Sequence, residues 1–492
     1  MAIKTIRPTG IVVSDMNRSR PFYRDVLGGM EIPMSLDEPR TTAVTQSVEH
    51  SIPSLRSQRI ARRASLMIAL AIVAGSFGAF AEAAKPKPVT GLSLDKARIC
   101  VTGFDHNRPD DFPGLGDFIG WTSGAVRLAN GDLLFVHSAG YWHVSFATPV
   151  VLRDDLIEPY RKMGFDLKHK APTGGRIMAC RSTDGGKTWS KPVTVYDGPL
   201  DDRPSAAFVT HKGTVIVIVN VQASWYGFSK APKGHQRLNT RQMVIRSNDN
   251  GHTWSRPSPL KSSGTYYTRG LSHGVQLPDG GLLWMSYDMN QGRSLLDGTI
   301  HRSDDDGRTW RVISVIRRRK PDGDRVAVAD LVVSGDADAF LKLGKPEDGK
   351  WLDTDEGDLG RLSSGRLVLV VRPDGGTLVS DDSGVKWRQI SRVGPKYVYA
   401  PHLVVLADNT IVLTAGGSGG QCIFLSTDGG KTWSAPIRID PGVYGYGKLT
   451  LLKDQSLLLS YVWQHHAPQR CYMVHLKVND SRDGVELLSM GK

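Results

Sequence analysis

The chain is poor in cysteine and lacks the long apolar runs and clustered metal ligands that mark several large protein classes. Only 4 of its 492 residues are cysteines, too few for a disulfide-rich scaffold. The apolar run at residues 66–80 is shorter than the roughly 20 residues that a membrane-spanning helix needs. No His or Cys spacing is typical of a zinc site, and the pair His465 and His466 offers too few ligands. We therefore predict no metal and no cofactor.

Signatures of nucleic-acid binding are also missing, although the chain is basic. It has 62 Lys and Arg against 49 Asp and Glu, a formal net charge of +13. Such a charge favours an anionic partner, such as an acidic glycan, a nucleic acid or a membrane surface. Because no helix-turn-helix, zinc-finger or RNA-binding motif is present, we expect no nucleic-acid partner. A generally basic secreted protein is the alternative explanation of the charge.

The first 56 residues precede the main body of the chain and differ from it in composition. Residues 1–35 predict a strand, a helix and a strand. Through residues 10–16 and 20–32 they resemble the opening of the glyoxalase/bleomycin-resistance (vicinal oxygen chelate) family, without its metal-ligand histidine. A βαβ fragment alone cannot bury both faces of its strands, so we expect no activity from it. Residues 36–56 are polar and without period, which indicates a disordered linker.

Residues 57–84 are typical of an export signal. Arginines between residues 56 and 63 precede the apolar run, and small residues at 79–81 or 81–83 fit a cleavage site. The segment is predicted to act as a signal peptide or, if uncleaved, as a signal anchor that leaves its basic side in the cytoplasm. In both cases we expect the rest of the chain to be periplasmic or secreted, with membrane contact only through such an anchor.

A turn with the pattern Ser-x-Asp-x-Gly-x-x-Trp occurs five times. Ser and Asp side chains accept hydrogen bonds from backbone N–H groups a few residues on and so close a tight turn. The Trp adds a large apolar surface for packing beneath the turn. Because five copies would scatter one chemistry over separate sites, we interpret them as staples of β-hairpins and not as catalytic groups. The copies are Ser182/Asp184/Gly186/Trp189, Ser247/Asp249/Gly251/Trp254, Ser303/Asp305/Gly307/Trp310, Ser380/Asp382/Gly384/Trp387 and Ser426/Asp428/Gly430/Trp433.

A second repeat consists of an apolar strand, a polar turn and another apolar strand. It occurs at residues 123–135, 205–219, 272–285, 357–371, 401–414 and 447–460. Each copy but the last is followed by one of the five turns, and successive turns lie about 45 to 75 residues apart. This spacing suits a four-stranded blade with its loops. The sequence therefore predicts an all-β fold, a six-bladed β-propeller over residues 96–492, which we expect to be monomeric.

Closing such a ring requires the two ends of the propeller to share a blade. The available strands are residues 97–102 and 470–478, which carry Cys100 and Cys471. An oxidising compartment would permit a disulfide between them. Two buried free thiols are the other possibility.

The five turns are similar to the Asp boxes, or BNR repeats, of the sialidase (neuraminidase) superfamily. The resemblance implies that they lie between the third and fourth strands of the blades, far from the active site. It also implies a catalytic set: a tyrosine nucleophile with a nearby glutamate, three arginines that clamp the substrate carboxylate, and an aspartate acid/base. A neutral phenol is not repelled by that carboxylate, but its pKa near 10 requires an adjacent carboxylate to take its proton.

Three members of this set have matching residues here. Glu356 opens the fourth hairpin and Arg372 ends it, as the family's glutamate and middle arginine do. Tyr446 matches the tyrosine that opens the last blade, with Tyr444 as the alternative. The resemblance therefore implies that Tyr446 and Glu356 are catalytic and that Arg372 binds substrate.

Two of the family's three arginines have no match. Residues 121–123 and 416–420 occupy their expected places and contain no arginine. Because a hydrogen bond to a charged group contributes about 1.5–3 kcal/mol, we do not expect ordinary sialidase activity. Arg203 and Arg269 are candidates to supply the missing cationic contacts.

Further candidates come from the strand starts and loops that face one end of a propeller channel. The long loop of the first blade offers Asp154 or Asp155 as the acid/base. Aromatic and cationic groups converging on this end suit a carbohydrate with acidic groups. The additional substrate-binding candidates are Trp121, His273, Tyr399 and His402.

Three functions fit these residues. The first is an exported sialidase-like glycoside hydrolase that acts on an acidic glycan. The second is a polysaccharide lyase in which His273 or His402, with Tyr446, abstracts a proton from a uronic acid. The third is a propeller that binds glycans without catalysis.

Overall fold

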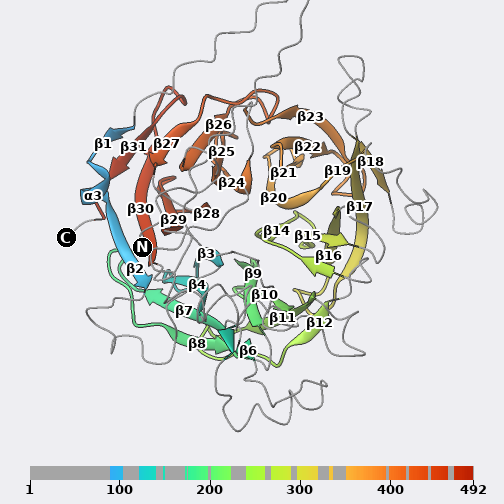
Figure 1. Ribbon diagram of the computed structural model, residues 1–492, viewed down its shortest axis with the longest axis horizontal. Coiled ribbons are helices and arrows are strands. Elements are labelled where there is room, and N and C mark those ends of the chain that lie inside the picture. Colours follow the sequence, from blue (N-terminus) through green and yellow to red (C-terminus); the bar gives the residue numbers. More distant parts are fainter. Residues whose placement is uncertain are drawn as a thin grey trace, which may run out of the picture. The chain divides into compact units, whose positions relative to one another are not determined.

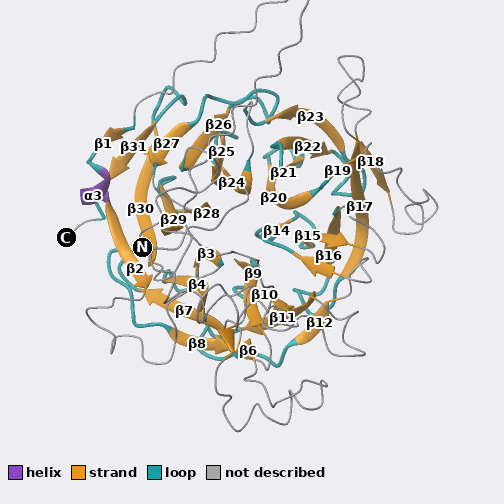
Figure 2. Cartoon of the chain, viewed as in Figure 1, coloured by secondary structure: helices purple, strands orange, loops and turns teal. Residues whose placement is uncertain are grey.

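The computed structural model consists almost entirely of strands, which form small sheets that follow one another around a ring (Figures 1 and 2). Helix α3 (Leu94–Ala97) is the one helix among the described residues. The arrangement is a six-bladed β-propeller, so the fold prediction is confirmed. The structure describes residues 89–103, 121–139, 148–149, 172–173, 176–197, 201–222, 240–260, 267–289, 296–319, 332–335, 351–394, 398–416, 420–441, 445–463 and 470–490.

In blades one, two, four and five the four consecutive strands pair antiparallel from the axis outward (Figure 1). Blade one contains β3 (Thr122–Arg127), β4 (Leu133–Ala139), β7 (Arg176–Ser182) and β8 (Val193–Tyr196). Blade two contains β9 (Asp201–Val209), β10 (Val215–Gln222), β11 (Thr240–Ser247) and β12 (Ser258–Leu260). Blade three contains β13 (Tyr267–Arg269), β14 (Val275–Gln276), β15 (Leu282–Met289), β16 (Asp297–Ser303), β17 (Arg311–Arg319), β18 (Val332–Gly335) and β19 (Trp351–Leu352). In this blade β13 and β14 both pair with β15.

The remaining blades follow the same plan. Blade four contains β20 (Asp355–Arg361), β21 (Leu367–Arg372), β22 (Gly376–Ser380) and β23 (Arg388–Arg392). Blade five contains β24 (Tyr399–Val405), β25 (Ile411–Gly416), β26 (Gln421–Ser426) and β27 (Ile437–Asp440). Blade six contains β28 (Gly445–Leu451), β29 (Leu457–Trp463), β30 (Arg470–Val478), β31 (Val485–Leu488), β1 (Thr90–Gly91) and β2 (Arg98–Gly103). In blade six β1 pairs parallel with β31. A separate pair, β5 (Thr148–Pro149) with β6 (Pro172–Thr173), lies between β4 and β7 in the chain.

The hydrophobic core is divided into layers between adjacent blades. Residues 215–219 of β10 are all apolar and 0% exposed, because neighbouring blades cover both faces of the strand. One layer packs Leu134 and Val136 of blade one against Ala207 and Val217 of blade two. A strand buried on both faces appears in the sequence as a continuous apolar run instead of an alternating one.

The two ends of the propeller close the ring in blade six. Strand β2 pairs with the first half of β30, and β31 pairs with its second half, so segments far apart in the chain lie side by side (Figure 1). The predicted closing strands are therefore confirmed. Cys100 and Cys471 form no disulfide: Cys471 is buried as expected, whereas Cys100 is exposed. The register pairs Cys471 with Thr102 instead of Cys100.

The five Asp boxes form the turns between the third and fourth strands of blades one to five. In the first box, Ser182 Oγ donates to Asp184 Oδ1 at 2.8 Å and accepts from the N–H of Gly186 at 2.8 Å. The hydroxyl and the backbone N–H of Thr188 donate to Asp184 and lower the pKa of that carboxyl to about 2. All five box aspartates accept hydrogen bonds within such turns, which agrees with the structural role predicted from the sequence.

Three predicted segments lie outside the described residues. These are the glyoxalase-like fragment at 1–35, the linker at 36–56 and the export signal at 57–84. Of the residues that are described, none belongs to a helix with the length and apolar character that crossing a bilayer requires.

We predict that replacing the box tryptophan of blade three, Trp310→Ala, destabilises the propeller by about 3–5 kcal/mol, because a buried aromatic side chain is lost. Trp310 is 9% exposed, donates to Gly307 O and packs edge-on against Phe208 of blade two. The equivalent Trp254 is partly exposed, so Trp254→Ala is the matched control with a smaller loss. Urea unfolding measures both variants, and equal losses would contradict this view of the boxes.

Candidate active site

A repeated turn places equivalent residues of all six blades at the same height along the axis. In every blade a five-residue turn joins the first two strands and is closed by two backbone hydrogen bonds. These turns begin at Leu128, Thr210, Leu277, Leu362, Leu406 and Leu452. Six residues before this start lie Glu356 in blade four and Tyr446 in blade six. The two residues therefore occupy the same position on strands that share one axis.

Irregular strand pairing around Glu356 and Tyr446 turns their side chains away from the regular sheet. The register of β20 shifts between Asp355 and Gly357, around Glu356, and that of β28 shifts between Gly445 and Lys448, around Tyr446. A β-bulge inserts an unpaired residue and re-aims its side chain. The topology and the bulges together bring these two residues to the axis.

Tyr446 is buried in a small aromatic cluster and has an unusual backbone. It is 5% exposed, and its φ of 56° lies in the left-handed region, which a bulky residue adopts only at a cost. Its ring centroid lies 6.1 Å from that of Trp121 of blade one. Its hydroxyl lies 2.8 Å from that of Tyr399 of blade five. The next residue, Gly447, lets the Gln421 side chain pack close to the strand, because a Cβ there would lie 2.2 Å from it.

Two carboxylates of blade four face Arg372. Arg372 Nη1 lies 2.9 Å from Glu356 Oε2, and its Nε lies 3.7 Å from Asp355 Oδ2. Burial and the neighbouring charge of Glu356 raise the pKa of Asp355. The guanidinium carbon of Arg372 is 4.4 Å from the ring centroid of Tyr399, a cation–π distance. Contacts thus run from Glu356 through Arg372 and Tyr399 to Tyr446.

Two arginines cover the other side of the cluster. The guanidinium carbon of Arg203, from blade two, is 4.9 Å from the Trp121 ring centroid, and that of Arg269, from blade three, is 5.8 Å away. Arg203 is fully buried, whereas Arg269 is half-buried. The fold therefore brings seven predicted site residues into one set of contacts: Trp121, Arg203, Arg269, Glu356, Arg372, Tyr399 and Tyr446.

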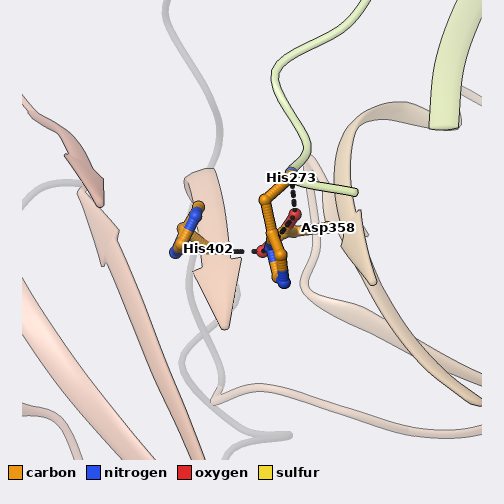
Figure 3. Close-up of side chains that lie close together, drawn as sticks. All are labelled: His273, Asp358 and His402. Carbon is orange, nitrogen blue, oxygen red and sulfur yellow. Dashed lines mark hydrogen bonds and ion pairs between the residues drawn. The ribbon is translucent and has the colours of Figure 1, made fainter. Parts of the chain in front are cut away.

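A layer with four polar side chains lies two residues further along each first strand, four residues before the turn. Its members are Gly124, Ala206, His273, Asp358, His402 and Lys448. Asp358 accepts from the backbone N–H of His273 at 2.7 Å and of Leu403 at 2.7 Å, and lies 2.9 Å from His273 Nδ1 (Figure 3). Lys448 donates its ammonium hydrogen to the carbonyl of Leu271 in blade three. Hydrogen bonds in this layer therefore link blades three, four, five and six.

The charged groups in this layer shift one another's pKa values. Burial would raise the pKa of Asp358, but His273, His402 and Lys448 lower it to about 2. Burial lowers the pKa of Lys448 to about 8, while the carboxylates of Asp358 and Glu356 oppose a larger fall. Burial also lowers the pKa of His402 well below its ordinary value. At neutral pH the layer therefore contains an ionised Asp358, a charged Lys448 and a neutral His402.

His273, Asp358 and His402 offer three potential ligand atoms within 4.8 Å of one another. The hydrogen bonding argues against a metal among them. His402 Nδ1 accepts the Leu449 N–H at 3.1 Å, and Asp358 already accepts from two backbone N–H groups. The buried ammonium of Lys448 would also repel a cation. We interpret this group as a hydrogen-bonded layer and not as a metal centre.

The layer contains two charged residues that the sequence interpretation missed, Asp358 and Lys448. Their signal was available, since each follows a predicted catalytic residue, Glu356 or Tyr446, by two positions. His402 is 3% exposed and bonded to backbone, so the substrate contact proposed for it stays a prediction.

The acid/base candidates Asp154 and Asp155 lie outside the described residues. Their proposed role therefore also stays a prediction.

Comparison with known proteins places this ring among proteins with the same repeats. A family model described as a BNR repeat-like domain matches residues 176–415, and one described as a BNR/Asp-box repeat matches residues 424–435. A sialidase of Micromonospora viridifaciens is 25% identical over 333 residues, which is 62% of this chain and 47% of that protein. A sialidase of Bacteroides fragilis (strain YCH46) is 25% identical over 324 residues, 57% of this chain and 53% of that protein. The chain thus spans about half the length of these curated relatives.

A solved structure extends the likeness to the fold. Hadza microbial sialidase Hz136 superposes with a TM-score of 0.54 at 18% identity and covers 75% of this chain and 67% of that chain. At this identity the match concerns the fold alone. The family matches lie within residues 176–435, and they do not support the glyoxalase resemblance proposed for residues 1–35.

We predict that Asp358→Asn destabilises the protein at neutral pH by about 3–5 kcal/mol, because it leaves the buried Lys448 charge without its carboxylate. The pKa of Asp358 is depressed in the folded state, so its contribution is present above the unfolded pKa of about 4 and is lost as pH falls toward 2. Denaturant unfolding should therefore show the two proteins converging across that interval.

Asp381→Asn is the matched control for this experiment. Asp381 pairs with Arg366 at 2.6 Å on the exposed rim, where the loss should stay below about 1 kcal/mol. A difference between wild type and Asp358→Asn that persists unchanged down to pH 2 would contradict the ionised state of Asp358.

Proposed function

This chain belongs to the sialidase superfamily of BNR/Asp-box repeat proteins, and from that premise we propose that it is a glycoside hydrolase that acts on an acidic glycan. The observation that carries the proposal is the contact chain that joins Tyr446 to Arg372 and Glu356 at the axis. Glu356 and Arg372 belong to blade four and Tyr446 to blade six, and each was identified separately by motif. The propeller fold alone does not require these three residues to converge, so their contacts favour a shared function.

The proposed reaction uses Tyr446 as the nucleophile. Its phenol oxygen bonds to the anomeric carbon as the glycosidic C–O bond breaks, and the phenol proton passes to the Glu356 carboxylate. The departing oxygen takes a proton from Asp154 or Asp155, the acid/base candidates. Water then attacks the anomeric carbon and gives a proton to the same aspartate, while the bond to the tyrosine oxygen breaks and that oxygen takes its proton back from Glu356. A neutral nucleophile of this kind suits an anomeric centre that carries a negative group.

The substrate's acidic group is proposed to bind on the side of Arg203 and Arg269. Arg372 is already flanked by the carboxylates of Glu356 and Asp355, so the positive field on that side is largely neutralised. The two arginines at Trp121 come from blades two and three and bring two positive charges to one side of the cluster. The net charge of +13 favours the same class of ligand. Export to the periplasm or the medium, proposed from residues 57–84, would give access to such glycans.

A lyase is the second candidate, and one observation favours it. The carboxylate of Asp358 holds the His273 imidazole at 2.9 Å, an arrangement that orients a general base. The His273 side chain is 25% exposed, unlike the buried His402. A uronic acid substrate would provide both an acidic group and a proton that such a base can remove.

We predict that the purified protein releases new reducing ends from at least one member of a panel of acidic oligo- and polysaccharides. Tyr446→Phe should lower this rate by a factor of at least about 10³, because the nucleophilic oxygen is gone. Tyr472→Phe is the matched control, since Tyr472 also lies under an arginine but on blade six away from the axis. Reducing ends accompanied by unsaturated-uronate absorbance would favour the lyase, and binding without products would favour a glycan-binding propeller.

We predict that Arg203→Met and Arg269→Met each weaken binding of an acidic oligosaccharide by about tenfold or more and leave its neutral analogue nearly unaffected, because each removes a charged hydrogen-bond donor. Isothermal titration calorimetry on the two ligands measures this difference. Arg98→Met is the control, since Arg98 stacks on Tyr472 at a similar distance of 4.7 Å. Equal losses for both ligands would contradict recognition of an acidic group by these arginines.

A further inference from the structure

The hydroxyl of Tyr399 donates a hydrogen bond to the hydroxyl of the proposed nucleophile, Tyr446. Tyr399 Oη lies 2.8 Å from Tyr446 Oη, and the two rings meet edge to face with centroids 5.2 Å apart and planes at 72°. The carboxylate of Glu356 instead pairs with Arg372. A second phenol from the neighbouring blade therefore lies within hydrogen-bond distance of the Tyr446 oxygen.

Tyr399 is held in this place from two sides. It begins strand β24, where its backbone pairs with Gly416 just before the register shift that lies between Tyr399 and His402. Arg372 lies over its ring at 4.4 Å, and Glu356 holds that guanidinium at 2.9 Å. A cation over the ring draws electron density from the phenol and makes its O–H a stronger donor.

We propose that Tyr399 is a positioning residue that donates its hydroxyl hydrogen to Tyr446 Oη and stabilises the negative charge that this oxygen develops as it loses its proton. A donor to the charged form of a group favours that form, and the effect is larger where water is excluded. Tyr446 is 5% exposed, which meets that condition. The pair also fixes the direction of attack, because the edge-to-face packing restricts rotation of the Tyr446 ring.

In this role Tyr399 acts on the nucleophile Tyr446, whereas the sequence predicted that it contacts the substrate. A substrate contact would change the binding of the sugar and leave the ionisation of Tyr446 as it is. A donor to Tyr446 Oη would change that ionisation in the free protein, before any sugar binds. The catalytic consequence rests on the proposed function, but the ionisation does not.

The test is an ultraviolet titration of the tyrosines in the full chain without ligand. The contribution of Tyr446 is the difference between wild type and Tyr446→Phe, and the same difference is measured in the Tyr399→Phe background. Removing the donor should move the ionisation of Tyr446 upward by about one pH unit or more, the size expected for a hydrogen bond to a charged group. An unchanged ionisation in a Tyr399→Phe variant with the wild-type unfolding midpoint would overturn the inference.

Tyr472→Phe is the matched control, because it removes one hydroxyl from a ring that also lies under an arginine, and it should leave the Tyr446 ionisation unchanged. Where a substrate is found, Tyr399→Phe should lower kcat about tenfold or more, change KM less than twofold, and move the pH profile in the direction of the titration. A higher KM with an unchanged kcat would return Tyr399 to the role of substrate contact and overturn the inference. If no glycan on the panel is cleaved but Tyr399→Phe still shifts the ionisation of Tyr446, the proposed function is wrong and the role of Tyr399 as a donor to Tyr446 stands.

Discussion

The carboxylate of Asp358, buried at the axis, is the interaction on which the geometry of the site depends. It accepts hydrogen bonds from His273 of blade three and from the Leu403 N–H of blade five, while belonging to blade four itself. A buried carboxylate without such partners would be strongly unfavourable, so the three blades have little freedom to shift relative to one another at this height. Glu356 lies two residues earlier on the same strand, and its position is set by that anchor.

The buried lysine of blade six completes the constraint. Lys448 donates to the Leu271 carbonyl of blade three, and Leu271 packs in the same cluster as Tyr446 and Trp121. The cost of burying an ammonium group is offset only while Asp358 is ionised and the backbone acceptor is in reach. The polar layer therefore fixes the position of the aromatic cluster that packs against it. The left-handed backbone of Tyr446, on the next layer, is tolerated because its surroundings determine it from several sides.

Much of the fold followed from local patterns. An Asp box is closed by hydrogen bonds within eight residues, so Ser303, Asp305 and Trp310 can be interpreted without any knowledge of their neighbours. The six apolar hairpins were equally local, since each is a pair of buried strands joined by a short turn. The contacts at the axis were harder to predict, because they join residues whose separation in the chain carries no information. Asp358 and Lys448 were overlooked for this reason, although their offset from Glu356 and Tyr446 repeats between blades.

The sequence by itself determined the number of blades, the rim turns, the strands that close the ring, and the proposal of Tyr446, Glu356 and Arg372 as a catalytic set. Periodicity and turn chemistry are short-range properties, and a repeated fold displays them several times. Only the tertiary structure decided that Arg372 is held between two carboxylates and Tyr399, that Cys100 and Cys471 form no disulfide, and that a second phenol reaches Tyr446. Those outcomes depend on the register between strands and on the angle between blades, which arise when the whole ring closes.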